Sequence, residues 1–410
     1  MAGDYIQNLF AERIGGSKFG VDTPVYKFER IKRAKRRFLQ EHPDTELLDF
    51  GIGEPDKRPP IKIIDELHRT AHILPKHGYT DTGTEKFKQA ISKYMRSYYG
   101  VDVDPETEVL PTIGTKEALA NFPKVMINPG DVALVTVPGY PVLGTNTGYL
   151  DGKIYNIPLR KERNFLPDLE SIPEDTRKMA KILYLNYPNN PTGAVANKDF
   201  YEEVIDFAKD NKLVVVQDAA YAALVYNSEP LSFLSVDGAK DVGIEVHSFS
   251  KSYNMTGWRL GFAVGNSLLI KGLATIKDNT DSGSFEAIQE AGIRAMDNPH
   301  FTKKIVQIYS RRLDLVVNAL NNVGLEAEKP GGTFYLYVQI PRGNKDRIFA
   351  DAEEFSQYLI TEKGIVTVPW DDVGNYVRFS ATFNARNKKE GVRIAAALEE
   401  RLADAGFYFG

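Results

Sequence analysis

The chain of 410 residues contains no cysteine. This absence excludes a disulfide framework, a thiolate metal site and a cysteine nucleophile, and it fits a reducing cytoplasm. We accordingly predict no metal centre. Hydrophobic residues make up 42% and charged residues 26% of the chain, as in an ordinary globular protein.

Charge of one sign is not in excess, because the formal net charge is only −4 at pH 7. A chain of this length with so little charge lacks the field that attracts nucleic acids or anionic membranes. No apolar run approaches the roughly 20 residues that span a bilayer. Residues 1–5 also lack the charged and apolar regions of a signal peptide. We therefore predict a cytoplasmic protein that binds neither nucleic acid nor membrane.

Residues 27–38 are an exception, since they are rich in lysine and arginine. Phe28, Ile31 and Phe38 recur beneath these charges at helical spacing. We therefore favour an amphipathic helix with a solvated basic face over a nucleic-acid patch.

The length of the chain predicts two domains, because one hydrophobic core rarely grows to this size. Residues 284–325 have the pattern of long helices, and residues 331–338 and 377–380 have the pattern of strands, which suggests a smaller α+β domain. We predict an N-terminal arm (1–24), a large α/β domain (51–290) and a small α+β domain (25–50 and 291–410).

Three apolar runs in the middle of the chain, at 132–137, 182–185 and 213–216, are predicted strands. They are apolar on both faces, which is typical of a parallel sheet covered by helices. Turn-forming or polar residues follow each run at once. Because ligands bind at the carboxyl ends of strands in such sheets, we expect a binding site at this edge.

A fourth apolar run leads into residues 247–261, where Lys251 is flanked by small hydroxyl residues and followed eight positions later by Arg259. This pattern fits a lysine that forms a Schiff base with an aldehyde cofactor, with Ser248, Ser250 and Arg259 on the cofactor's phosphate. A single lysine is much more often a solvated surface residue. The interpretation therefore depends on motifs elsewhere in the chain.

Those motifs are Asn190-Pro-Thr-Gly193, Asp218-x-x-Tyr221 and Arg378-Phe-Ser380. Together with Ser248-x-x-Lys251 and Arg259, and in this order, they resemble the fold-type I aminotransferases of the aspartate aminotransferase superfamily, over residues 24–405. The resemblance implies an aspartate-aminotransferase-like α/β fold, with a mostly parallel seven-stranded sheet between helices and a smaller α+β domain. It also implies a homodimer whose active sites are shared across the interface.

The cofactor implied by this resemblance is pyridoxal 5′-phosphate, with Lys251 as the catalytic residue that carries a proton between substrate and cofactor. Asp218 matches the partner of the ring nitrogen, Tyr221 and Asn190 match the partners of the phenolic oxygen, and Tyr140 matches the ring that stacks on the cofactor. Taken singly, Asp218 would be a turn residue and Tyr140 a core residue. The phosphate positions are Thr115, Lys116, Ser248, Ser250, Arg259 and, from the neighbouring subunit, Tyr79.

Substrate contacts are also implied by the resemblance. Arg378 matches the arginine that binds the substrate α-carboxylate, and the backbone of Gly53 completes that site. The further substrate positions are Asn190, Tyr140, Lys116 and Tyr26. Tyr26 and Ser282 would act from the partner subunit, and Glu54 could meet a distal ammonium.

Residues 5–16 and 187–193 resemble the LL-diaminopimelate aminotransferases within the superfamily. They predict transamination between LL-diaminopimelate and 2-oxoglutarate, giving tetrahydrodipicolinate and glutamate. Two alternatives keep the cofactor: an aminotransferase for alanine, aspartate or an aromatic amino acid, and a β-lyase. A transcription regulator is disfavoured, since about 24 residues before the basic helix cannot hold a DNA-binding domain. The Gly-x-Gly-x-x-Gly turn of nicotinamide-dependent dehydrogenases is missing.

Overall fold

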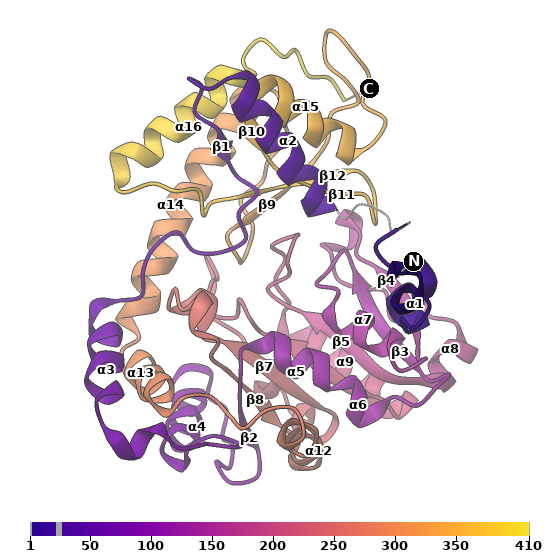
Figure 1. The fold of residues 1–410 in the computed structure, drawn as a ribbon, viewed down its shortest axis with the longest axis vertical. Coiled ribbons are helices and arrows are strands. Elements are labelled where there is room, and N and C mark those ends of the chain that lie inside the picture. The colour runs from indigo at the N-terminus through magenta and orange to yellow at the C-terminus, as the bar shows by residue number, and fades with distance from the viewer. Residues whose placement is uncertain (1, 22–26, 410) are drawn as a thin grey trace.

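A seven-stranded sheet forms the centre of the larger part of the computed structural model, which describes residues 2–21 and 27–409 (Figure 1). The strand order is β2-β8-β7-β6-β5-β3-β4. Only β8 is antiparallel to its neighbours, which confirms the mostly parallel sheet. The strands are β2 (Val109–Thr112), β3 (Val132–Val137), β4 (Lys153–Pro158), β5 (Ala180–Asn186), β6 (Val214–Asp218), β7 (Gly243–Ser248) and β8 (Gly261–Gly265).

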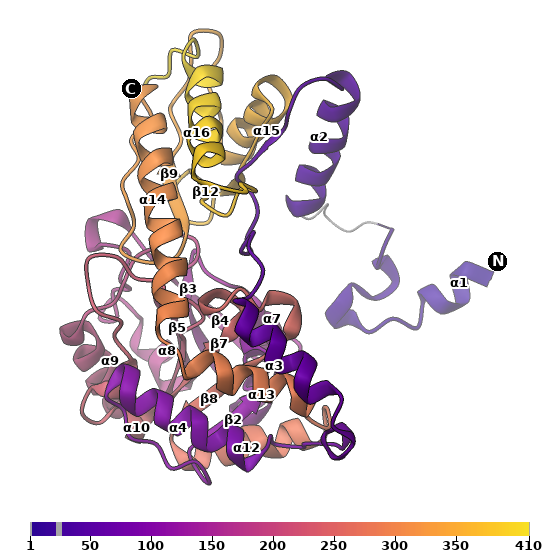
Figure 2. The same cartoon turned by 90° about the vertical axis from the view of Figure 1, so that its left-hand side faces the viewer.

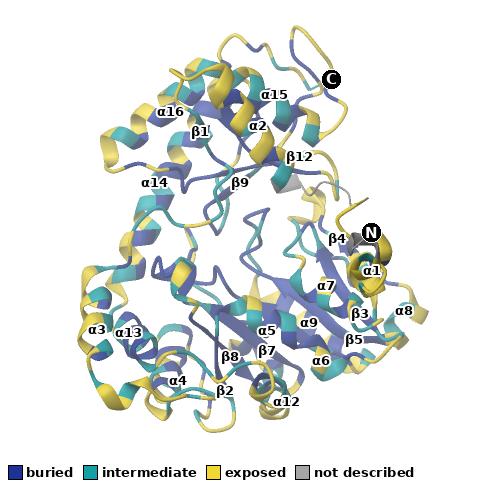
Figure 3. Cartoon of the chain, viewed as in Figure 1, coloured by how far each residue is buried: buried dark blue, intermediate teal, exposed yellow. Residues whose placement is uncertain are grey.

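Helices cover both faces of this sheet, and the strands between them are buried (Figure 3). On one face α4, α9 and α13 pack over Leu134, Leu183 and Val215, and on the other α5, α7 and α12 pack over Val135 and Val216. The helices are α3 (Ile61–Ala71), α4 (Glu85–Tyr99), α5 (Thr115–Asn121), α6 (Pro123–Met126), α7 (Val142–Gly148), α8 (Glu174–Met179), α9 (Lys198–Asn211), α10 (Ala239–Val242), α11 (Phe249–Ser252), α12 (Ser267–Asp278) and α13 (Glu286–Met296). Short 3₁₀ helices are η3 (Leu74–His77), η4 (Lys161–Arg163), η5 (Phe233–Ser235) and η6 (Thr256–Trp258).

The smaller part combines a three-stranded antiparallel sheet, in the order β11-β12-β9, with a short parallel pair of β1 and β10. In Figure 1 it lies above the large sheet. Its elements are α2 (Lys27–Glu41), β1 (Leu48–Asp49), α14 (His300–Asn322), β9 (Tyr335–Gln339), α15 (Ala352–Lys363), β10 (Ile365–Val366), β11 (Val368–Trp370), β12 (Tyr376–Ser380) and α16 (Lys388–Leu402). Its core cluster continues to Tyr221 and Leu224 of the larger part, and the predicted domain boundaries stay a prediction.

One strand is shorter than predicted, because β9 begins at Tyr335 and not at Gly331. Thr333 has a φ of 64°, which a strand does not allow. Gly332 donates its N–H to the carbonyl of Gly193 at 2.9 Å, and a Cβ there would lie 2.5 Å from Pro188. Residues 331–334 therefore form a closely packed turn against residues 188–193 of the larger part.

Helix α2 has the amphipathic character that was predicted. Ile31 and Phe38 are buried, and Arg33 and Arg37 pair with glutamates of the same helix. Before it, the chain forms an arm of α1 (Ala2–Gln7), η1 (Glu12–Ile14) and η2 (Gly16–Lys18) that projects to one side of the molecule (Figure 2). Arg13 of this arm donates to the carbonyl of Tyr149 at 3.4 Å. Within the described residues, no helix is both long and apolar enough to cross a membrane.

Candidate active site

A cavity of about 1190 Å³ opens where β5, β6 and β7 end, at the carboxyl edge predicted for the binding site. The terminal residues of these strands, Asn186, Asp218 and Ser248, all line it. Residues of the smaller part, including Arg378, complete the wall. The predicted site residues that line the cavity are Gly53, Glu54, Thr115, Lys116, Tyr140, Asn190, Asp218, Tyr221, Ser248, Ser250, Lys251, Arg259 and Arg378.

Lys251 lies in the short helix α11, directly after the buried strand β7. Its Nζ donates a hydrogen bond to the carbonyl of Gly53 at 2.8 Å. Burial lowers the pKa of Lys251 to about 8; Glu54 opposes this shift, while Arg378 and Arg259 add to it. The amine is therefore much closer to its free, nucleophilic form at neutral pH than an ordinary lysine is.

Asp218 ends β6 and is only 3% exposed. One carboxylate oxygen accepts the N–H of Ala220 at 3.1 Å, and the other accepts the Tyr184 hydroxyl at 3.2 Å. Burial raises the pKa of Asp218 to about 6, and these two hydrogen bonds and the nearby His247 limit the rise. At neutral pH the group remains mostly an anion, which suits it to a cationic partner in the cavity.

Arg259 lies beside the turn that starts α5, and its guanidinium donates only to the carbonyls of Thr256 and Ile113 among the described residues. Gly114, with a φ of +75°, leaves the space for it, since a Cβ there would be 2.5 Å from Nη2. Thr115 and Lys116 begin the helix at this point. An arginine without a carboxylate partner beside free helix N–H groups is suited to bind an anion such as a phosphate.

Arg378 is only 4% exposed, yet no described carboxylate forms an ion pair with it. Its Nη1 donates to Asn190 Oδ1 at 3.0 Å, its Nη2 donates to the carbonyl of Gly51 at 3.2 Å, and its Nε has no hydrogen-bond partner. The guanidinium lies 4.1 Å from the centre of the Tyr335 ring. A buried cation held only by neutral groups leaves its charge available for an anionic ligand.

Several cavity residues were not predicted from the sequence. The Tyr335 hydroxyl contacts the hydroxyl of Tyr221 at 3.0 Å and donates to the Gly53 carbonyl at 3.2 Å, so it joins two predicted positions. Asn186 donates to the Asp218 carbonyl and accepts the N–H of Asn190. Asn186 was detectable, because it ends an apolar strand as Asp218 does. Trp370 and Asp372 lack such a signal.

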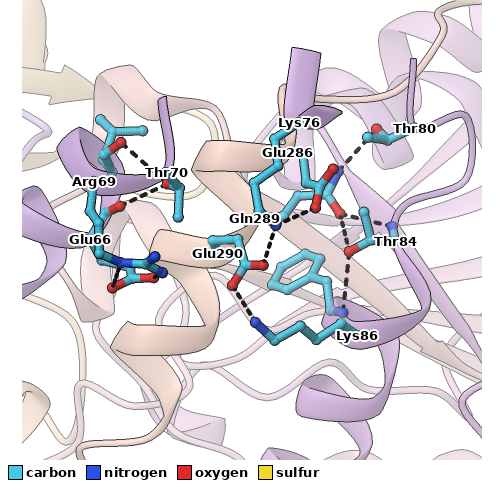
Figure 4. Close-up of polar contacts among 12 residues, drawn as sticks. Glu66, Arg69, Thr70, Lys76, Thr80, Thr84, Lys86, Glu286, Gln289 and Glu290 are labelled. Atoms are coloured by element: carbon cyan, nitrogen blue, oxygen red, sulfur yellow. Dashed lines mark hydrogen bonds and ion pairs between the residues drawn. The ribbon is translucent and has the colours of Figure 1, made fainter. Parts of the chain in front are cut away.

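Tyr79 is 87% exposed and does not line the cavity of its own chain. The segment around it is nevertheless held firmly against α13 (Figure 4). Lys76 is 2.6 Å from Glu286 and 2.7 Å from Glu290, and the buried amide of Gln289 binds the side chains of Thr80 and Thr84. The predicted contact of Tyr79 with a neighbouring subunit stays a prediction.

The other two positions predicted to act across the interface are Ser282 and Tyr26. Ser282 is exposed, and its carbonyl accepts the N–H of Asp81, close to Tyr79 in the chain. Tyr26 falls outside the described residues.

Known proteins resemble this chain over almost its whole length. Residues 45–397 match the model of the family described as aminotransferase class I and II. A protein of Methanocaldococcus jannaschii named LL-diaminopimelate aminotransferase is 58% identical over 98% of this chain and 96% of its own length. A Methanococcus maripaludis protein of the same name is 52% identical over 99% of both chains.

Solved structures agree with these matches. Substrate-bound BacF from Bacillus subtilis superposes with a TM-score of 0.85 and 34% identity, covering 95% of this chain and 97% of that chain. A mutant aspartate aminotransferase of Thermus thermophilus superposes with a TM-score of 0.83 and 27% identity, covering 96% and 98%. The predicted aspartate-aminotransferase-like fold is therefore confirmed, and the chain belongs to the class I and II aminotransferase family.

Proposed function

We propose that this enzyme transfers an amino group between LL-diaminopimelate and 2-oxoglutarate, giving tetrahydrodipicolinate and glutamate, with pyridoxal 5′-phosphate as its cofactor. The names of the relatives that are 58% and 52% identical support the substrate. The observation that carries the chemistry is one cavity that holds the Lys251 amine, the buried Asp218 carboxylate and two arginines without described carboxylate partners.

The charges of the cavity fit the cofactor. Arg259, with Ser248, Ser250, Thr115 and Lys116, would bind its phosphate dianion. When bound, pyridoxal phosphate supplies an aldehyde that condenses with amines and an electron-poor ring that stabilises negative charge at the substrate α-carbon.

The opposite end of the cofactor would meet a different set of side chains. Asp218 would keep the ring nitrogen protonated, Tyr221 and Asn190 would bind the phenolic oxygen, and Tyr140 would lie against the ring. Asp218 suits this role because its two hydrogen bonds fix the carboxylate and its pKa of about 6 keeps it anionic at neutral pH.

Lys251 would move the proton in the reaction. Its Nζ is oriented by the Gly53 carbonyl, and its lowered pKa makes the free amine accessible near neutral pH. A base of this kind can take the α-proton of the substrate and deliver it to the adjoining carbon of the cofactor.

Arg378 would bind the substrate α-carboxylate through its guanidinium fork. Asn190 and Gly51 hold the fork from two sides, and Tyr335 lies beneath its plane. Because this arginine is already desolvated and fixed, little ordering remains to oppose carboxylate binding.

The proposal includes a homodimer in a cytoplasmic location, in which Tyr79 of each subunit reaches the phosphate site of the other. The 87% exposure of Tyr79 supports the dimer, because its neighbours Lys76 and Thr80 are bound to Glu290 and Gln289 and an exposed aromatic residue on such a segment is suited to an interface.

The test is a donor series with the purified enzyme and 2-oxoglutarate, in which glutamate formation is measured with LL-diaminopimelate, alanine, aspartate and phenylalanine. We expect LL-diaminopimelate to give the highest kcat/KM. A higher kcat/KM for another donor would change the assigned substrate and leave the assigned reaction, transamination, in place. Release of pyruvate and ammonia without any oxo acid would instead indicate a β-lyase.

The matched control is Lys251→Ala. Removing the proton-transfer base should lower kcat by a factor of about 10² to 10⁴ or more while cofactor still binds noncovalently. Wild-type turnover in this variant would contradict the assignment of Lys251.

A further inference from the structure

Two carboxylates of the cavity have no role in the proposed function. The ionisable groups that it uses are Asp218 and the cations Lys116, Lys251, Arg259 and Arg378. Glu54 and Asp372 remain, and both line the same cavity. Neither forms an ion pair or a hydrogen bond with another of the described residues. No cavity cation is left over to neutralise them, so the unassigned charge of the cavity is negative.

Glu54 belongs to the catalytic end of the cavity. It follows Gly53, whose carbonyl accepts the Lys251 amine, and its charge raises the pKa of Lys251. The structure thus relates Glu54 to the reacting amine, and its predicted contact with a distal ammonium stays a prediction.

Asp372 lies in the turn between β11 and β12, the hairpin that carries Arg378. In this hairpin Val368 is opposite Arg378 and Trp370 is opposite Tyr376. Cross-strand partners share a face of a sheet, and so do residues two apart. Arg378 and Trp370 therefore point to one side, and the chain continues from Trp370 to Asp372 along the cavity wall.

Arg378 and Asp372 line the same cavity, the first from β12 and the second from the turn that precedes it. A substrate with its α-carboxylate on Arg378 and an extended side chain would run along the hairpin toward Asp372.

We propose that Asp372 is a specificity-determining residue that binds the side-chain ammonium of the amino donor. The proposal rests on the proposed function, because it assumes that Arg378 holds the α-carboxylate. It makes the site selective for donors whose side chain carries a distal amine. A solvated carboxylate at the cavity wall gains attraction when the entering substrate displaces water around it.

The test compares two donors that differ only in the distal amine, LL-diaminopimelate and L-2-aminopimelate. Their kcat/KM values are measured with 2-oxoglutarate for the wild type, Asp372→Asn and the control Glu54→Gln. Asp372→Asn should lower kcat/KM for LL-diaminopimelate about tenfold or more, mostly through KM, because a charged hydrogen bond is lost. It should leave L-2-aminopimelate unchanged. Glu54→Gln should affect both donors alike.

The outcomes separate the two proposals. If Asp372→Asn lowers kcat/KM equally for both donors, or for neither, the assignment of Asp372 is overturned while the proposed reaction stands. If the wild type uses neither donor, the proposed substrate fails. Asp372 is then tested with the ammonium-bearing donor L-lysine against its amine-free counterpart L-norleucine. A fall in kcat/KM for lysine but not for norleucine in Asp372→Asn would uphold the cation-binding role, and an equal change for both would overturn it.

Discussion

Two buried arginines of this enzyme, Arg312 and Arg378, are alike in exposure, at 2% and 4%, and opposite in their surroundings. Arg312 forms a two-pronged ion pair with Asp56 at 2.8 and 2.9 Å. It also donates to the carbonyls of residues 381, 383 and 385. Among the described residues, Arg378 has only an amide and a carbonyl as hydrogen-bond partners, and its Nε has none.

This difference separates a structural arginine from a binding one. Desolvating a guanidinium costs several kcal/mol, and an ion pair with good hydrogen bonds offsets that cost. At Arg312 the offset is built into the fold, so α14 is fixed to the segment after β1 and the one after β12. At Arg378 it is incomplete, and an anionic ligand must supply the rest. A buried arginine is therefore identified as a binding residue by its incomplete set of hydrogen-bond and ion-pair partners, and not by burial alone.

The largest effect is expected from Arg312→Ala. It removes the two-pronged partner of the buried Asp56 and leaves it only the longer contact with Lys57 at 3.4 Å as an ion pair, so the free energy of unfolding should fall by about 3 kcal/mol, measured by denaturant titration. The double variant Arg312→Met, Asp56→Leu removes both charges and should recover much of this loss. An unchanged unfolding midpoint in the single variant would mean that the two arginines do not differ as described.

Arg378→Ala should affect binding instead of stability. Because the substrate α-carboxylate then loses its arginine, kcat/KM should fall by an amount equivalent to about 2–4 kcal/mol, a factor of roughly 30 to 1,000. The unfolding midpoint should change much less than in Arg312→Ala, and cofactor content should be normal. Arg378→Lys keeps the positive charge but not the two-pronged geometry, so its kcat/KM should lie between those of the wild type and Arg378→Ala. Loss of cofactor in Arg378→Ala would show that this arginine has been misplaced.

A smaller effect concerns the pKa of Lys251, which is lowered to about 8 by burial and, to a smaller extent, by Arg378. The free amine increases as the pH rises through this value, so the apo-enzyme should take up pyridoxal phosphate faster with rising pH until a plateau. Arg378→Met removes a like charge and should move this profile to higher pH. Glu54→Gln removes the opposing charge and should move it to lower pH. Identical profiles in all three proteins would contradict the electrostatic coupling.

The edge of the sheet that holds the site was predictable from local sequence, because Asp218 ends one apolar strand and Lys251 follows another by three residues. The roles of these two residues and the seven-stranded sheet came from the family resemblance. Strand β4 was missed because its outer residues, such as Lys153 and Ile154, are exposed, so it lacks the two-sided apolar pattern of the central strands.

The unpredicted part depends on contacts between distant segments. Tyr335 meets Gly53 and Tyr221 only after the two parts of the molecule have packed together. Likewise, nothing near Arg312 in the chain shows that its partner is Asp56, more than two hundred residues away. The distinction between the two arginines is therefore a property of tertiary packing and not of either motif.

The smallest effect should come from a third arginine, Arg393, which forms a two-pronged pair with Glu46 at 2.7 and 2.9 Å. This pair has the same geometry as the Arg312 pair, but both of its side chains are about half exposed. Water and salt screen such a pair, and ordering its side chains offsets most of the attraction. Arg393→Ala should therefore leave the unfolding midpoint and kcat/KM at wild-type values, measured in parallel with Arg312→Ala. A loss comparable to that of Arg312→Ala would mean that pairing geometry, and not burial with a complete set of partners, determines what an arginine contributes to this fold.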